Sequence, residues 1–212
     1  MKYLIALPCM DMVQTMFMKS LLGMHRPERT EFGIACSSLV YDARNSLAVK
    51  AITEGFDRVL WIDSDMTFEP DMMNRLIAHL DAGKDIVSGI YITRKPPFKP
   101  VIFESIGYER VGETFEVIPR ARTMYEYPKD SVFEIMGAGF GGVMTPVPIL
   151  KAIYDKYGLP FTPMLGFGED LSFCLRAHDM GYKMWCDSTI KLGHVGYTTI
   201  DEQTYLKGLS NA

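Results

Sequence analysis

Short, uninterrupted apolar runs alternate with longer amphipathic stretches over the first 93 residues of the chain. The runs predict strands, and the stretches between them, which repeat apolar residues every three or four positions, predict helices. We expect strands at Lys2–Leu7, Phe32–Ser37, Arg58–Ile62 and Asp85–Ile92, and helices at Asp11–Leu22, Tyr41–Glu54 and Pro70–Ala82. Strands that are apolar throughout are typical of a sheet covered by helices on both faces, so this half predicts an α/β fold.

The pattern changes between Arg94 and Met136. Three prolines open a segment biased toward Arg and Lys, in which short β-like runs are separated by turn residues. The runs are Val101–Phe103, Phe115–Ile118 and Val132–Ile135. We expect this segment to form a small antiparallel insertion, or lobe, beside a mixed but mainly parallel sheet.

The alternation of helix and strand returns after residue 137. Helices are expected at Pro148–Tyr157 and Asp170–Asp179, a strand at Tyr182–Cys186 followed by the run Ile190–Val195, and a short helix within 201–212. With 212 residues the chain is long enough to bury a sizeable core. We therefore expect a single domain over 1–212, with parts at 1–93, 94–136, 137–200 and 201–212.

Composition and charge narrow the function only slightly. The chain is 48% hydrophobic and 23% charged, and its net charge of -4 argues mildly against a nucleic-acid binder held by bulk charge. The apolar start ends at Pro8, which is too short for a signal peptide, and we expect no membrane span and a cytoplasmic location. The four cysteines have no zinc-site spacing and predict buried free thiols in a reducing compartment: Cys9, Cys36, Cys174 and Cys186.

The tripeptide Asp63-Ser64-Asp65 is the main candidate for chemistry. It follows the apolar run Val59–Ile62, and if the strand continues, its two carboxylates point the same way. Converging carboxylates repel each other unless a cation lies between them, and hard oxygen ligands suit Mg²⁺ or Mn²⁺. The alternative is a polar turn in front of the helix that begins near Pro70, since Asp and Ser are common in turns.

Glu169 and Asp170 form a second candidate site. A loop containing Gly166 and Gly168 delivers the two carboxylates to a helix N-terminus. Asp170 as a helix cap, with Glu169 facing the helix dipole, is a complete structural explanation. A capping carboxylate is also well oriented, so Asp170 is equally a candidate general base for a substrate hydroxyl.

Two further positions carry weaker signals. Arg44-Asn45 lies in the first turns of a predicted helix, where a positive charge is unfavourable without an anion, which a bound diphosphate or a carboxylate such as Asp42 supplies. His194 follows an apolar run and precedes Gly196; a single His there is more often a hydrogen-bonded structural residue than a metal ligand.

The segment Gly137–Gly142 formally matches the dinucleotide fingerprint G-x-G-x-x-G. That fingerprint joins the first strand of a fold to its helix, whereas this segment lies late in the chain, and the prolines Pro146 and Pro148 follow it. We interpret it instead as a glycine strand that lets a ligand approach the backbone.

Taken in order, these motifs resemble the GT-A-fold glycosyltransferases, which use nucleotide-sugar donors. The first half, with Ala43-Arg44-Asn45, Asp63-Ser64-Asp65 and Pro70-Asp71, resembles the nucleotide-sugar half of family-two-like members, and also mannosyltransferases of the Anp1 type. The second half, with Glu169–Arg176, Gly181-Tyr182-Lys183 and His194, resembles the acceptor half. The resemblance implies a Rossmann-like sheet and a metal-dependent transfer of sugar to a hydroxyl.

The resemblance also implies roles for individual residues. Asp63 would face the ribose or the metal, and Asp65 and His194 would bind Mn²⁺ or Mg²⁺. Asp170 would be the base in an inverting reaction, and Glu169 would orient or bind the acceptor; the class also includes retaining members, so the stereochemical outcome stays open. The donor would be contacted by Arg44 at its phosphates and bordered by further residues: Pro8, Asp11, Asn45 and Ser64.

The chain departs from the family pattern where the nucleoside binds. Cys9-Met10-Asp11 replaces the usual Asn-Glu after the first strand, and Cys36-Ser37-Ser38 replaces an acidic strand end. The acceptor stays open among a glycan, a lipid-linked sugar, a protein hydroxyl and a modified nucleic-acid base. The alternatives to a glycosyltransferase are a nucleotidyltransferase that makes a nucleotide sugar and a non-catalytic sugar- or nucleotide-binding module.

Overall fold

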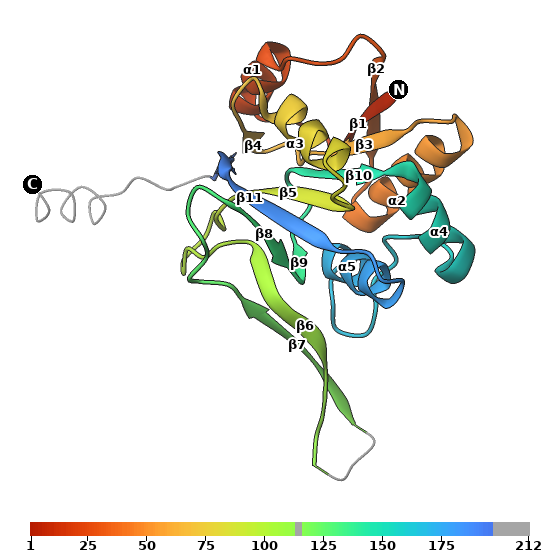
Figure 1. The fold of residues 1–212 in the computed structure, drawn as a ribbon, viewed down its shortest axis with the longest axis vertical. Helices are drawn as coiled ribbons and strands as arrows, with labels where there is room; N and C mark the ends of the chain where they lie inside the picture. The colour runs from red at the N-terminus through yellow and green to blue at the C-terminus, as the bar shows by residue number, and fades with distance from the viewer. Residues whose placement is uncertain (113–115, 197–212) are drawn as a thin grey trace, which may run out of the picture.

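The computed structural model describes residues 1–112 and 116–196, which are built around a seven-stranded sheet (Figure 1). The strand order is β2-β1-β3-β10-β5-β11-β8. Five strands run parallel: β1 (Tyr3–Cys9), β2 (Thr30–Cys36), β3 (Arg58–Trp61), β5 (Ile86–Ile90) and β11 (Met184–Lys191). The other two, β10 (Val143–Pro146) and β8 (Val132–Ile135), run antiparallel to them. The prediction of a mixed, mainly parallel sheet is confirmed.

Helices cover both faces of this sheet, as its apolar strands predicted. On one face lie α1 (Thr15–Gly23) and α3 (Met72–Asp81); on the other lie α2 (Val40–Thr53), α4 (Val147–Tyr157) and α5 (Glu169–Asp179). Alternation along the strands fills both cores, since Leu4 packs with α2 and α4 while Ile5 packs with α1 and α3. Among the described residues, no helix is both long and apolar enough to span a membrane.

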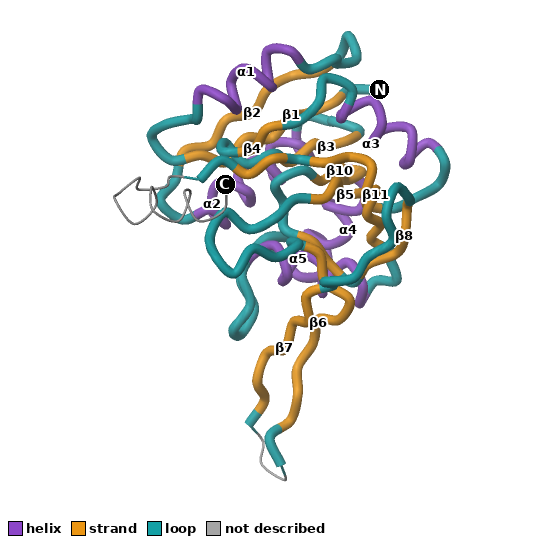
Figure 2. Tube along the Cα trace, turned by 90° about the vertical axis from the view of Figure 1, so that its left-hand side faces the viewer, coloured by secondary structure: helices purple, strands orange, loops and turns teal. Residues whose placement is uncertain are grey.

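The insertion is a long hairpin that projects from the body of the molecule (Figures 1 and 2). It pairs β6 (Ile102–Arg110) with β7 (Val117–Thr123), and β9 (Gly137–Ala138) joins β6 to give a three-stranded antiparallel sheet. Two expectations for this region change. The run Val132–Ile135 belongs to the central sheet as β8, and the expected strand at Phe115 begins at Val117 among the described residues. The helix expected within 201–212 lies outside the described residues.

Two strands differ from the sequence prediction for identifiable reasons. The predicted strand Tyr182–Cys186 is β11, which continues to Lys191 through a polar stretch that resembles a turn in sequence. That stretch is buried because its side chains are satisfied: Ser188 donates to the carbonyl of Pro128, and Asp187 accepts from Thr189. The strand β10 was not predicted, because its short sequence ends at a proline next to a helix.

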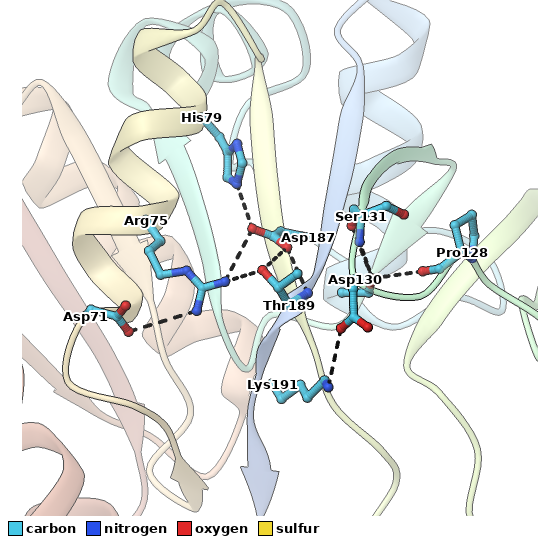
Figure 3. A network of polar contacts seen from close by, with 10 residues as sticks. Asp71, Arg75, His79, Pro128, Asp130, Ser131, Asp187, Thr189 and Lys191 are labelled. Carbon is cyan, nitrogen blue, oxygen red and sulfur yellow. Dashed lines mark hydrogen bonds and ion pairs between the residues drawn. The ribbon is translucent and has the colours of Figure 1, made fainter.

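A polar network ties α3 to β11 (Figure 3). Asp187, only 4% exposed, lies 2.7 Å from His79 Nε2 and accepts a 2.6 Å hydrogen bond from Thr189 Oγ1. Arg75 donates to Thr189 and lies 3.8 Å from Asp187. The network fixes the strand just before β12 (Gly193–His194), so it positions the segment that carries His194.

Candidate functional site

A cavity of about 390 Å³ opens at the carboxyl edge of the parallel strands. The chain leaves β1, β2, β3 and β5 at this edge, and open α/β sheets bind their ligands there. The residues that line it come from those strand ends, from the loop after β5, from the segment before β10, and from α2, α5 and β12: Pro8, Cys9, Met10, Ser37, Ser38, Val40, Arg44, Asp63, Ser64, Asp65, Tyr91, Arg94, Phe140, Glu169, Asp170 and His194.

Asp65 and His194, which the resemblance assigns to one cation, lie side by side in this cavity. The short strand β4 (Met66–Thr67) pairs antiparallel with β12 in the register His194 to Met66, and the N–H of Val195 donates to the carbonyl of Asp65. As a result Asp65 Oδ2 lies 3.4 Å from His194 Nε2. The other ring nitrogen, Nδ1, lies 3.2 Å from the carbonyl of Ile92, which can only accept, so Nδ1 carries hydrogen and Nε2 faces the carboxylate.

The electrostatics of this pair favour a charged carboxylate. Burial raises the pKa of Asp65, but the hydrogen bond and charge of His194 and the charge of Arg94 outweigh it and lower the pKa overall. The hydrogen bond to Asp65 raises the pKa of His194 more than burial lowers it. Arg94, about half exposed, contacts the same carboxylate through Nη1.

Asp63 belongs to a second, separate cluster around the buried Arg44. Arg44 Nη2 donates to Asp63 Oδ1 at 2.7 Å and Nε donates to Glu169 Oε1 at 3.2 Å, while Nη1 lies 3.5 Å from the carbonyl of Phe140. Burial lowers the pKa of the guanidinium, yet the charges of Asp63, Glu169 and Asp170 raise it overall. Arg44 is therefore the internal countercharge of three carboxylates. Arg44 pairs with Asp63 and Glu169, and not with Asp42, the alternative partner considered from the sequence.

Asp170 lies in the first turn of α5 beside this cluster. Burial and the charge of Glu169 raise its pKa to about 6, while the backbone N–H of Leu171, which donates to Asp170 Oδ1 at 2.7 Å, and Arg44 oppose the rise. The cap position is Gly168, so the prediction that Asp170 caps the helix is wrong by two residues. Asp170 is free of a strong ion pair and faces the cavity, which suits a proton acceptor.

The two aspartates of Asp63-Ser64-Asp65 do not converge on one point. The strand β3 ends at Trp61, and the tripeptide forms a turn. In this turn Asp63 pairs with Arg44, and Asp65 pairs with Arg94. Among the described residues, no group of three or more His, Cys, Asp and Glu side chains gathers closely enough to hold a metal. The expected set of Asp63, Asp65 and His194 is therefore present only as the pair Asp65 and His194.

The remaining predicted positions divide between the cavity and the core. Pro8 and Ser64 line the cavity, whereas Asp11 is exposed on the loop beyond it and is not among the lining residues. Asn45 is buried, and its Oδ1 accepts a 2.8 Å hydrogen bond from the N–H of Phe161. Asn45 therefore holds the loop before α5 and has no contact with the cavity in this structure.

Tyr91, Arg94 and Phe140 are among the lining residues that sequence reasoning missed. Tyr91 follows β5 at the carboxyl edge, and burial together with the charges of Asp63 and Asp170 raises its pKa well above the usual value. Its place directly after a strand is the signal that could have found it. Arg94 was counted only as part of a basic segment, and Phe140 was hidden inside the glycine run.

At two positions the glycine run makes room for side chains of the protein. A Cβ at Gly139 would collide with the hydroxyl of Tyr91, and one at Gly142 would collide with Leu192. The run lets Tyr91 pack beneath the cavity. The expectation that glycine here brings a ligand close to the backbone is wrong for these two positions.

Comparison with solved structures places the fold. The chain matches the crystal structure of A197 from STIV with a TM-score of 0.65 and 17% identity, over 93% of this chain and 87% of that chain. It matches GalNAc-T7 with UDP, GalNAc and Mn2+ (TM-score 0.60, 8% identity) over 93% of this chain and 43% of that chain. It matches S. aureus TarS 1-349 (TM-score 0.55, 15% identity) over 92% of this chain and 60% of that chain.

These similarities define the class of the fold: the chain has the GT-A architecture. For the second and third of these structures the chain covers less than two thirds of the neighbour's length. No family model matches the sequence, and no curated protein matches it. At these identities the comparison concerns the fold, and the chemistry must be argued from the cavity itself.

Proposed function

We propose that this protein is a metal-dependent glycosyltransferase that moves a sugar from a nucleoside-diphosphate sugar to an acceptor hydroxyl. The observation that carries the proposal is the cavity itself, in which the pair Asp65 and His194 and the basic carboxylate Asp170 face one space. In this proposal Asp65 and His194 bind the donor through a cation, and Asp170 removes the proton of the acceptor, at two separate places in the same cavity. A metal-dependent transfer that inverts the anomeric centre uses both the cation and the base.

Asp65 and His194 fit a divalent cation such as Mn²⁺ or Mg²⁺. A carboxylate oxygen and an imidazole nitrogen 3.4 Å apart have the chemistry and the spacing of two ligands of one ion. Ile92 fixes the ring by accepting from Nδ1, which is the usual support of a metal-binding imidazole. When bound, the cation would neutralise charge on the leaving diphosphate. Substrate oxygens and water would supply its remaining ligands.

Arg44 acts as a positioning residue in this proposal. Its guanidinium is 2% exposed and is occupied by Asp63, Glu169 and the backbone of Phe140. It holds the two carboxylates in fixed places rather than binding phosphate. Arg94, which is half exposed and lines the cavity, is the arginine available to a phosphate group.

Asp170 is the proposed base. As the acceptor hydroxyl attacks the anomeric carbon, its proton passes to the Asp170 carboxylate and the bond between the sugar and the diphosphate breaks. A pKa near 6 leaves Asp170 deprotonated at neutral pH yet basic enough to accept a proton. Glu169, held by Arg44, contributes the negative charge that helps to raise this pKa.

The nucleoside would lie against the ends of β1 and β2. That wall is formed by small and apolar residues from both strand ends and the start of α2: Pro8, Cys9, Met10, Ser37, Ser38 and Val40. Of the described residues within 94–136, only Arg94 lines the cavity, so the projecting hairpin does not form its wall. The acceptor, whether a glycan, a lipid-linked sugar, a protein or a modified nucleic acid, would approach from the side of Asp170.

A donor screen tests the proposal. The protein is incubated with uridine-, guanosine-, cytidine- and thymidine-diphosphate sugars and Mn²⁺, and release of the nucleoside diphosphate is followed with and without chelator. We expect metal-dependent release from one donor class, lost in Asp170→Asn. Release of pyrophosphate from a nucleoside triphosphate and a sugar phosphate would instead indicate a nucleotidyltransferase. Tight nucleotide binding without turnover of any donor would indicate a binding module.

A further inference from the structure

Two cysteines lie side by side at the rim of the cavity. Cys9 ends β1 and Cys36 ends β2, and the parallel register places them directly opposite each other. Their Sγ atoms are 3.5 Å apart and both are free thiols. Neighbouring strands lie about 4.8 Å apart, which is within the range of about 4.4–6.8 Å that a disulfide requires between Cα atoms. Only the side chains must turn for the sulfurs to bond.

The pair differs from the other two cysteines in exposure. Cys36 is exposed and Cys9 is half-buried, whereas Cys174 and Cys186 are buried in the core. The expectation that all four cysteines are buried is therefore wrong for the pair. Burial and the neighbouring Cys36 raise the pKa of Cys9 to about 11, so Cys9 is a protonated thiol at neutral pH. Cys36 is the sulfur that an incoming reagent meets first.

We propose that Cys9 and Cys36 form a redox modification site, which closes to an intramolecular disulfide by exchange with a low-molecular-weight disulfide such as oxidised glutathione. The geometry carries this inference: paired register, adjacent sulfurs, and one exposed thiol backed by a second. The inference goes beyond the proposed transfer reaction and does not depend on it.

The exchange takes two balanced steps. The Cys36 thiolate attacks one sulfur of the small disulfide, which forms a mixed disulfide and expels one small thiolate. Cys9 then loses its proton to solvent, attacks the Cys36 sulfur and expels the second small thiolate. The protein loses two protons and two electrons, and the small disulfide becomes two thiols.

The bond would lock the wall of the cavity. Ser37 N already donates to the Cys9 carbonyl at 3.2 Å, and Cys9, Met10 and Ser37 all line the cavity. A covalent link between the two strand ends would join the loops that leave β1 and β2 at the point where they diverge.

Mass spectrometry after treatment with oxidised glutathione tests the site. In the wild-type protein we expect the loss of two alkylatable thiols, a Cys9–Cys36 linked peptide, and at least about tenfold more protein disulfide than glutathione adduct, because the second attack is intramolecular. Dithiothreitol should reverse it. Cys174 and Cys186 serve as internal controls, which should be alkylated only after denaturation.

Two serine variants separate the steps. Cys9→Ser should retain glutathione on Cys36, and Cys36→Ser should react with oxidised glutathione at least about tenfold more slowly, because the remaining thiol, Cys9, is less accessible. The wild-type peptide map does not depend on either variant folding well. A stable glutathione adduct on wild-type Cys36, disulfides only between molecules, or no reaction of either thiol would overturn the proposal.

Discussion

Asp65 Oδ2 lies 3.4 Å from His194 Nε2, although the two residues come from opposite halves of the chain. The pairing of β4 with β12 brings them together, and the same carboxylate also contacts Arg94. A cation that binds Asp65 must therefore compete with a guanidinium. This competition gives a prediction that involves no substrate.

Replacing Arg94 with Gln should tighten binding of Mn²⁺ to the protein alone. An exposed ion pair contributes about 0.2–1 kcal/mol, so the expected gain in affinity is about 1.4- to 5-fold. Isothermal titration of Mn²⁺ checks it, with Lys99→Gln as a charge-matched control on the same loop. Weaker binding in Arg94→Gln would show that Arg94 supports the cation rather than competing with it.

The acidic side of the pH profile should depend on Asp170. Its pKa of about 6 predicts that kcat/KM falls as the pH drops below about 6, because the base must be deprotonated. Asp170→Asn should lower the transfer rate by about 10²–10⁴-fold while donor binding is retained. An unchanged rate in this variant would remove Asp170 from the reaction.

Glu169→Gln offers a sharper version of this test. The substitution removes a negative charge that helps to raise the pKa of Asp170. The charge of Arg44, which lowers that pKa, then has one carboxylate fewer to balance it. The acid limb of the pH profile should therefore move to lower pH. Asp42→Asn is the control, because it removes the charge of an exposed carboxylate; it should leave the acid limb of the pH profile in place. A limb that moves equally in both variants would indicate a general charge effect.

Arg44→Met should destabilise the fold strongly. The substitution leaves Asp63 and Glu169 without their buried countercharge, and breaking a buried pair from one side costs about 3–5 kcal/mol. Urea unfolding of this variant and of Arg44→Met/Asp63→Asn measures the cost; the double variant should recover part of it. Equal stability of wild type and Arg44→Met would mean that the cluster is not coupled as described.

The sequence predicted the scaffold well because its signals are local. Buried strands and helices ended by glycine are encoded within a few residues, and helix α2, expected at Tyr41–Glu54, forms at Val40–Thr53. Gly83 and Gly181, which follow α3 and α5, have the positive φ angles that favour glycine. The α1 helix is less accurate, since it begins at Thr15 rather than Asp11.

The site was predictable only in part, because much of it depends on distant contacts. That Asp65 and His194 lie close together was implied by the family resemblance. The preference of Asp63 for Arg44, and the contact of Arg94 with Asp65, depend on how a turn and a loop pack, which no local pattern encodes. Asn45 is another residue whose role could not be predicted locally. Arg44, the preceding residue, lines the cavity, whereas the side chain of Asn45 accepts a hydrogen bond from the backbone of Phe161.

Asp187→Asn should weaken the link between α3 and β11. Burial raises the Asp187 pKa, but hydrogen bonds from Thr189 and His79 lower it overall. A lowered folded pKa means that the stabilisation is present above the unfolded value of about 3.9 and is lost as the pH falls through the folded value. Loss of a buried, hydrogen-bonded carboxylate should cost about 1–3 kcal/mol at pH 7.

Urea unfolding of Asp187→Asn across pH checks this prediction. The difference from wild type should shrink as the pH falls below about 3.9. Asp155→Asn, which removes an exposed ion pair with Lys151, should change stability by less than about 1 kcal/mol. A deficit in Asp187→Asn that does not depend on pH would mean that packing, rather than charge, holds the strand.

Electron spin resonance of Mn²⁺ in the presence of a nucleoside diphosphate tests whether Asp65 and His194 share one cation, since bound and free ion give different signals. Wild-type protein and Asp170→Asn should bind the ion equally, because Asp170 accepts the proton of the acceptor hydroxyl and is not a ligand of the cation. Asp65→Asn and His194→Gln should each lose at least about tenfold in affinity, about 1.4 kcal/mol, while His25→Gln, an exposed histidine, should not. Binding as tight in Asp65→Asn and His194→Gln as in wild type would contradict the account, because the two residues would then meet without a shared ion.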